Sequence, residues 1–159
     1  MNQSRPSFVR PGLVDRTINR LFGLLVRWGL GLSHNYLLQV QGRTSGRMYS
    51  TPVNVLEIST RRFLVAPRGE TQWVRNARVS GQVRLVKGKT SYNFRLRELA
   101  DVEKPEILKT YLDRFRTTVQ RYFPLPAGSP LEAFSNLAPM YPVFELRSVA
   151  TKTVSGPLP

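Results

Sequence analysis

The chain has 159 residues, and its 24 lysines and arginines outnumber its 10 aspartates and glutamates to give a formal net charge of +14. Cysteine is absent and histidine occurs once, at His34, which excludes disulfides, thiolate metal ligands and cysteine nucleophiles. This length suits a single domain. The positive field attracts nucleic acid, acidic lipid surfaces or phosphorylated cofactors without choosing among them. No metal site is predicted.

The amino-terminal part predicts an arm followed by a helix. Residues 1–12 are polar and hold two prolines, so they lack the apolar core of a cleavable signal. Over residues 13–28 apolar side chains recur at spacings of three and four, and arginines occupy the other side. Such a basic amphipathic helix either covers one side of a core or lies on an anionic membrane. We therefore predict a cytoplasmic protein, with peripheral contact to the inner face of the cell membrane through residues 13–28 as an open alternative.

Residues 33–150 predict one domain, between the arm and helix at 1–32 and a tail at 151–159. Its clearest feature is a hairpin in which residues 82–87 and 90–99 alternate apolar and polar side chains around a two-residue turn. Strands joined by hairpins, with few helices between them, favour a mainly β antiparallel barrel with flanking helices (α+β) over a wound parallel sheet. The six predicted strands are residues 36–40, 51–58, 62–66, 82–87, 90–99 and 142–149, and the predicted helical segments are 71–78, 105–123 and 130–134.

The turn between the first two strands has the sequence GRTSGR at residues 42–47. Its two glycines, Gly42 and Gly46, permit a tight turn with positive φ and a close approach of a ligand to the backbone. Successive N–H groups in such a turn can form an anion-binding nest, and arginine adds bidentate donors. A plain turn between strands is the alternative, because motifs of this kind are common.

A second loop, PRGETQW at residues 67–73, leads into the predicted short helix. Thr71 stands at the helix start, where its side chain is expected to cap the helix. The helix N-terminus presents free N–H groups and a positive dipole end. Trp73 and Asn76 are three residues apart and share one side of the helix. A planar ring would meet the indole while the Asn amide offers hydrogen bonds, or Trp73 simply fills the core.

The pattern GRTSGR…TPV, followed about one hairpin later by VAPRGETQWVRNARVSG, resembles the deazaflavin-dependent nitroreductase and quinone reductase family. The similarity runs in order over residues 32–149 and includes the closing PVFEL. The resemblance implies an antiparallel, six-stranded split β-barrel related to FMN-binding, pyridoxamine-oxidase-like domains. It also implies an oxidoreductase in which reduced coenzyme F420 gives a hydride to a quinone, nitro or similar conjugated acceptor. The protein would supply orientation and electrostatics for this chemistry.

The resemblance assigns roles to the two loops. The first loop corresponds to the part of the family site that holds the phosphate and acidic tail, and the second loop and short helix correspond to the part beside the ring. Thr44 and Tyr49 depart from the family pattern, since many members have Lys and Arg there, and Arg47 is expected to compensate. The implied cofactor-binding residues are Arg43, Thr44, Ser45, Gly46, Arg47, Pro52, Ala66, Arg68, Gly69, Trp73 and Asn76.

A proton donor near the acceptor would assist hydride transfer, and family members often place tyrosines from the last helix and its following loop over the ring. Tyr122 and Tyr141 are therefore the candidate catalytic residues, together with Tyr111 as a third tyrosine of this region. For each of them a packed aromatic role is the alternative.

Other readings stay open beside the reductase. One is a non-catalytic protein on the same fold that binds a flavin, a lipid or a membrane surface. Another is a reductase that uses FMN in place of coenzyme F420. Nucleic acid binding is disfavoured, because basic residues are scattered and no recognised module is visible. The expected partners are a small-molecule cofactor and a hydrophobic acceptor, and the oligomeric state, a homodimer included, stays open.

Overall fold

The computed structural model of the chain describes residues 33–149. The predicted arm and helix at residues 1–32 and the predicted tail at 151–159 lie outside the described residues, and so does the membrane contact predicted for residues 13–28. Within residues 33–149 no helix is long and apolar enough to cross a membrane.

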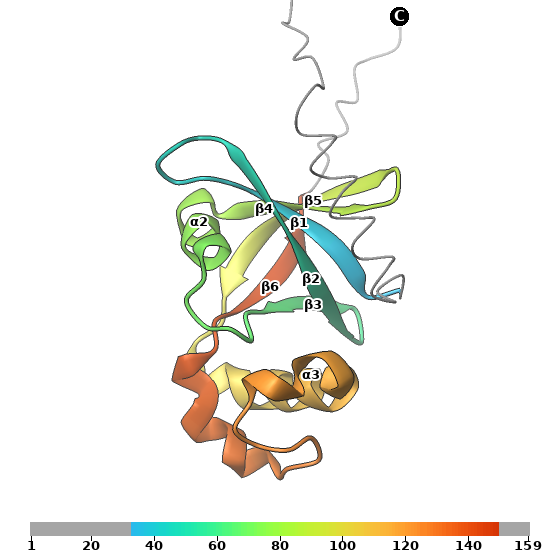
Figure 1. Cartoon of the computed structure of the whole chain (residues 1–159), viewed down its shortest axis with the longest axis vertical. Coiled ribbons are helices and arrows are strands. Elements are labelled where there is room, and N and C mark those ends of the chain that lie inside the picture. Colours follow the sequence, from blue (N-terminus) through green and yellow to red (C-terminus); the bar gives the residue numbers. More distant parts are fainter. Residues whose placement is uncertain (1–32, 150–159) are drawn as a thin grey trace, which may run out of the picture. The chain divides into compact units, whose positions relative to one another are not determined.

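Six strands make up the domain, namely β1 (Asn35–Gln41), β2 (Met48–Ile58), β3 (Arg61–Val65), β4 (Gln82–Lys87), β5 (Thr90–Glu98) and β6 (Val143–Ser148). They close into a barrel in the order β1-β2-β3-β6-β5-β4, and every neighbouring pair is antiparallel (Figure 1). β1 with β2, β2 with β3 and β4 with β5 pair as hairpins, β4 also pairs with β1, and β6 completes the barrel between β3 and β5. The predicted mainly β, six-stranded antiparallel barrel is confirmed.

The second strand is longer than its sequence pattern predicts. β2 begins at Met48 rather than at residue 51. Met48 and Tyr49 are 49% and 50% exposed, so apolar alternation gives no strand signal there. Pairing with β1 extends the strand, because Met48 lies opposite Gln41 and Tyr49 opposite Val40. The connection between the two strands is therefore confined to residues 42–47.

The barrel interior holds one of two hydrophobic clusters. All six strands contribute to it, and the helix α2 (Gln72–Ser80) adds Val74 and Ala77. This helix therefore packs its apolar side onto the barrel core, whose burial from water is the main force holding the strands together. The buried residues of the cluster are Leu38, Val40, Val55, Leu64, Ala66, Val74, Ala77, Val83, Leu85, Phe94, Phe144 and Leu146.

The second hydrophobic cluster lies on the other side of the strands. Leu56 and Phe63 belong to it, whereas their neighbours Val55 and Leu64 belong to the interior, because successive side chains of a strand point to opposite faces. The helices that cover this face are α3 (Lys104–Val119) and the 3-10 segment η3 (Leu131–Met140), which lie together in Figure 1. Shorter 3-10 turns, η1 (Asp101–Glu103) and η2 (Gln120–Tyr122), flank α3, which ends at Val119 before the predicted limit at 123.

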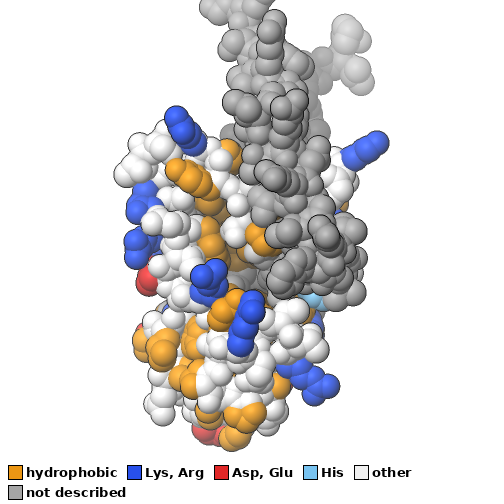
Figure 2. Space-filling model, in the orientation of Figure 1, with side chains coloured by type: hydrophobic (Ala, Val, Ile, Leu, Met, Phe, Trp, Pro, Cys, Tyr) orange, Lys and Arg blue, Asp and Glu red, His pale blue; other side chains and the backbone are white. Residues whose placement is uncertain are grey.

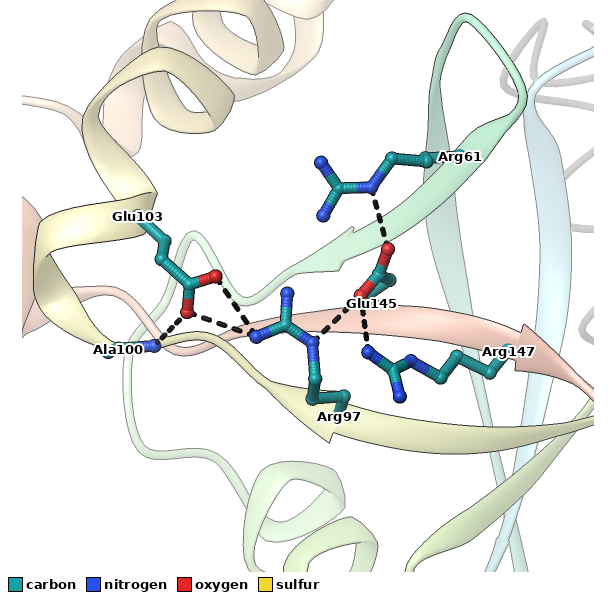
Figure 3. A network of polar contacts seen from close by, with 6 residues as sticks. All are labelled: Arg61, Arg97, Ala100, Glu103, Glu145 and Arg147. Atoms are coloured by element: carbon teal, nitrogen blue, oxygen red, sulfur yellow. Dashed lines mark hydrogen bonds and ion pairs between the residues drawn. The ribbon is translucent and has the colours of Figure 1, made fainter.

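A polar network joins the last strand to its neighbours (Figure 3). Glu145 of β6 accepts hydrogen bonds from Arg61 of β3 at 2.7 Å and from Arg97 of β5 at 2.8 Å, and Arg147 lies 3.5 Å away. Arg97 also contacts Glu103 at 3.0 Å. Glu145 is only 8% exposed. The hydrogen bonds from Arg61 and Arg97 lower the pKa of its carboxyl from 4.5 to about 2.

The positive charge is spread over the surface. Figure 2 shows Lys and Arg side chains scattered among apolar side chains on the visible face. Several arginines are neutralised locally, as Arg78 is by Glu70 and Glu98, each at 2.7 Å. The part of the chain that the structure describes thus offers several separate places for anions.

Candidate functional site

The loop between β1 and β2 is a closed turn. The Gly42 N–H donates to the Arg47 carbonyl at 2.7 Å, and the Gly46 N–H donates to the Gly42 carbonyl at 3.0 Å. Gly46 has a φ of 66°, the left-handed conformation expected of a glycine here. Gly42 is required for another reason, because a Cβ at this position would stand 2.4 Å from Cε2 of the Tyr49 ring.

Most N–H groups of this turn are engaged within the protein. Besides the two glycines, the Arg43 N–H donates to Asn76 Oδ1 at 3.2 Å, and the Arg47 N–H donates to Ser45 Oγ at 3.3 Å. Among the described residues the Thr44 and Ser45 N–H groups and the Arg47 guanidinium have no partner. The predicted anion nest is therefore smaller than the sequence pattern indicates. It consists of two consecutive N–H donors beside one unpaired arginine.

Arg43 ties the turn to α2. Its Nη1 donates to Asn76 Oδ1 and to Gln72 Oε1, each at 2.9 Å, in addition to the backbone bond to Asn76. Asn76 is 4% exposed, so its oxygen serves the turn rather than an incoming ligand. The structure thus brings Arg43 and Asn76 together. Gln72 was missed by the sequence reasoning, because only the folded position of Arg43 shows its role.

The N-terminus of α2 carries free donors. Thr71 is the N-cap residue, but its side chain makes no capping hydrogen bond, so the predicted side-chain cap is wrong. The Thr71 hydroxyl oxygen is buried and has no partner within the described residues. The N–H groups of Gln72, Trp73 and Val74 also lack partners there, as the first N–H groups of an uncapped helix do. Both loops therefore carry backbone donors that have no partner within the described residues.

The loop before α2 is only partly exposed. Ala66 is 1% exposed and its N–H donates to the Pro142 carbonyl at 2.9 Å, so it belongs to the barrel core. Gly69 takes a φ of 73° and donates to the Ala66 carbonyl at 3.0 Å, which turns the chain toward the helix. Arg68 projects from this turn, and within residues 33–149 its guanidinium forms no hydrogen bond or ion pair. Pro52 is exposed on β2, opposite Leu37.

Trp73 serves the core in part. Its ring lies 5.8 Å from the Phe144 ring at a tilt of 55°, and it packs at the edge of the interior cluster. The indole is half-buried rather than enclosed, so one part of it stays accessible. Trp73 and Asn76 do share a side of α2, as their spacing predicts.

The two candidate tyrosines lie in the second hydrophobic cluster, under α3 and η3. The Tyr141 hydroxyl donates to the Tyr122 carbonyl at 2.7 Å, and the Tyr141 ring stacks on Phe123 with centroids 4.5 Å apart. Burial raises the pKa of Tyr141, so it stays protonated at neutral pH. Its proton is held by a backbone oxygen. Tyr111 is buried with its hydroxyl bonded to Asn54, and burial raises its pKa as well. A catalytic role for Tyr122 or Tyr141 stays a prediction.

Tyr141→Phe is expected to lower the free energy of unfolding by about 1 kcal/mol, because the partly buried Tyr122 carbonyl would lose its donor. Urea unfolding at pH 7 measures this change. Tyr92→Phe is the matched control, since Tyr92 is 47% exposed on β5. Equal stability of the Tyr141→Phe protein and the wild type would contradict a structural role for this hydroxyl.

The chain belongs to the F420H(2)-dependent quinone reductase family, whose description matches residues 17–122, about two thirds of its length. The cofactor of this family is reduced coenzyme F420. No curated protein matches the chain.

Solved structures support the fold. The protein Atu2129 (unknown function) of Agrobacterium tumefaciens str. C58 is 19% identical with a TM-score of 0.53, and the match covers 91% of this chain and 59% of that one. An F420-H2 dependent reductase (FDR-A) is 18% identical with a TM-score of 0.50 over 72% of this chain and 95% of that one. A structure described as a domain-swapped dimer is 15% identical with a TM-score of 0.50 over 86% and 100% of the two chains. At these identities the likeness concerns the fold alone.

The residues on the α2 side of the barrel fit an anionic ligand with a planar ring. The free N–H groups of the turn and of the helix start, with Arg47 and Arg68, are donors suited to a phosphate or carboxylates. The buried, unpartnered Thr71 hydroxyl is a polar group that a bound molecule would satisfy. The accessible part of the Trp73 indole offers an apolar surface for a ring.

Proposed function

We propose that this protein is an F420H2-dependent reductase that delivers a hydride to a quinone. The observation that supports the proposal most strongly is the set of hydrogen bonds by which Arg43 of the turn is joined to Gln72 and Asn76 of α2. A long ligand with an anionic tail and a planar head would span both. The family membership gives the cofactor class, and the donors of the turn and of the helix start support this place for it.

In this proposal the turn holds the tail of the cofactor and the helix start holds the region near the ring. Thr44 and Ser45 would donate their N–H groups to the phosphate, and Arg47 would neutralise charge on the tail. Arg68 would serve the next anionic or carbonyl group, and Trp73 would flank the ring. When bound, the reduced deazaflavin supplies the hydride, and the protein supplies position and a fixed electrostatic environment.

The family description supports a quinone as the acceptor, and one exposed apolar side chain lies at the end of η3, near the second loop. Met140 is 57% exposed at the end of η3, and its carbonyl lies 3.4 Å from the place where a Cβ of Gly69 would stand. An exposed methionine beside this loop suits a hydrophobic, adaptable contact. A quinone is the acceptor that the family description names, and nitroaromatic or similar conjugated compounds are the related acceptors to compare.

Titration of the pure protein with oxidised coenzyme F420, FMN and FAD, followed by cofactor fluorescence, tests the proposal. We expect binding of coenzyme F420 at micromolar concentration or below and weaker binding of both flavins. Mixing the protein with reduced cofactor and a soluble quinone should then restore the absorbance of the oxidised deazaflavin. No binding of coenzyme F420 at micromolar concentrations, or tighter binding of FMN, would overturn the assignment.

We further propose that the protein is a homodimer. The support is that a protein of similar fold is described as a domain-swapped dimer. Light scattering after gel filtration should give twice the mass of the chain, and a monomer at all concentrations tested would refute this proposal.

A further inference from the structure

Tyr49 occupies a position that the cofactor proposal leaves without a role. It is the second residue of β2, and it is 50% exposed although it is aromatic. Its ring covers Gly42, where a Cβ would stand 2.4 Å from Cε2 and 2.8 Å from Ser45 Oγ. The ring therefore rests on the backbone of the turn, and a side chain at residue 42 would displace it or Ser45. The close approach to Gly42 therefore fixes the position of the Tyr49 ring, although the ring is exposed.

The hydroxyl groups of Tyr49 and Ser45 lie 3.2 Å apart and form a hydrogen bond. Ser45 Oγ also accepts the Arg47 N–H at 3.3 Å. A serine hydroxyl has two lone pairs and one proton. The phenolic O–H is the more acidic of the two hydroxyls and hence the better donor, so Tyr49 fills the second lone pair. Both acceptor positions of Ser45 are then used, and its own proton is left to donate outward.

The direction in which the Ser45 hydroxyl proton points matters because backbone N–H donors lie next to it in the turn. The N–H groups of Thr44 and Ser45 are the backbone donors of the turn that have no partner in the part of the chain that the structure describes. An anion that these two groups bind would meet the Ser45 hydroxyl as a third donor. A serine with an open lone pair could turn its oxygen toward the anion, and the repulsion would weaken binding.

We propose that Tyr49 is a positioning residue that fixes Ser45 as a hydrogen-bond donor to the anionic tail of the cofactor. The inference rests on the proposed function, and it deepens that function by naming how the tail is recognised. The turn then binds a phosphate diester or carboxylate chiefly through neutral donors. Of its two arginines, Arg43 is committed to Asn76 and Gln72, and Arg47 has no partner within residues 33–149. The Ser45 hydroxyl, held in place by Tyr49, then serves where a positively charged side chain would otherwise bind the anion.

A double-mutant cycle on Ser45 and Tyr49 tests the inference. Two probes are titrated by fluorescence: oxidised coenzyme F420, and the same deazaflavin chromophore without its phosphate and glutamyl tail. We expect Tyr49→Phe to weaken binding of coenzyme F420 roughly three- to tenfold, as the loss of one oriented hydrogen bond does. Ser45→Ala should weaken it at least as much, and adding Tyr49→Phe to Ser45→Ala should cause no further loss. Neither change should alter binding of the tail-less probe.

Tyr92→Phe is the control, because Tyr92 is similarly exposed but lies on β5. The inference is overturned if Tyr49→Phe leaves the affinity for coenzyme F420 unchanged. An equal loss in the Ser45→Ala background, or for the tail-less probe, would overturn it too. A wild-type protein that binds neither deazaflavin contradicts the proposed function instead.

A second measurement keeps the two failures apart. Inorganic phosphate added to the labelled full-length protein should shift the amide NMR signals of Thr44 and Ser45, with an apparent affinity that Tyr49→Phe lowers. Raising the salt concentration at fixed phosphate should change this affinity by the small slope expected for about one cation. Absence of shifts at Thr44 and Ser45, or identical titrations of wild type and Tyr49→Phe, would overturn the role of Tyr49 whatever the cofactor proves to be.

Discussion

Glu145→Gln is expected to lower the free energy of unfolding by about 2–3 kcal/mol at pH 7. The carboxylate is 8% exposed and is held by Arg61 and Arg97, and these two bonds lower its pKa to about 2. A neutral amide would leave three guanidinium groups, counting Arg147, close together with no carboxylate between them (Figure 3). Because the network joins β3, β5 and β6, the substitution would destabilise the pairing of β6 with its two neighbouring strands.

The same pKa gives the pH dependence of stability. Since folding lowers the pKa of Glu145, its contribution is fully present above pH 4.5 and is lost as the pH falls toward 2. Urea unfolding of wild type at pH 7 and pH 3 should show this loss, and Glu145→Gln should show a smaller difference between the two.

Glu57→Gln is the matched control for this experiment. Glu57 pairs with Arg62 at 2.8 Å, but its side chain is 53% exposed, and exposed pairs contribute only about 0–1 kcal/mol. Equal destabilisation by Glu145→Gln and Glu57→Gln would contradict the importance given to the buried network.

Asn76→Ala should have the largest effect on the site. It removes the acceptor for the Arg43 N–H and for one of the two guanidinium bonds, so only the bond to Gln72 still joins Arg43 to α2. We expect a loss of about 1–3 kcal/mol in the free energy of unfolding, because a partly buried N–H is left without a partner. The dissociation constant for coenzyme F420 should rise about tenfold, because the two halves of the site are held together only by the bond from Arg43 to Gln72.

Asn93→Ala is the control for that variant. Asn93 accepts a hydrogen bond from Arg84 at 3.1 Å on the exposed β4–β5 hairpin. Asn93→Ala therefore removes an arginine–asparagine pair of the same kind away from the site. Unfolding in urea and the fluorescence titration are both measured. An Asn76→Ala protein that binds coenzyme F420 as tightly as wild type would show that the link between turn and helix is not part of the site.

The barrel could be predicted because its strands alternate. Val53 and Val55 against Asn54 and Leu56 form the pattern of a strand with two different faces, and the structure places Val55 and Leu56 in separate clusters. The start of β2 could not be predicted in this way. Its first residues are exposed, and they become a strand only because β1 pairs with them.

The sequence predicts which segments form the candidate site, but it does not predict the contacts between them or the number of unpaired donors. The glycine positions indicate where the turn lies, and Gly46 takes the expected φ. The count of free donors depends on contacts between distant residues, above all Arg43 with Asn76, which are 33 positions apart. The uncapped Thr71 hydroxyl follows from local geometry that residue preferences do not fix. Glu145 and its arginines lie up to 84 positions apart, so no local pattern indicates their network.

We propose that the β1–β2 turn and the start of α2 form one site for coenzyme F420. Amide NMR of the labelled full-length protein during titration with oxidised coenzyme F420 tests it most directly. If the two segments form one site, we expect saturable shifts at Thr44 and Ser45 of the turn and at Gln72 and Trp73 of the helix. All four should give one dissociation constant. Shifts that avoid these four amides, or that appear at only one of the two segments, would contradict it.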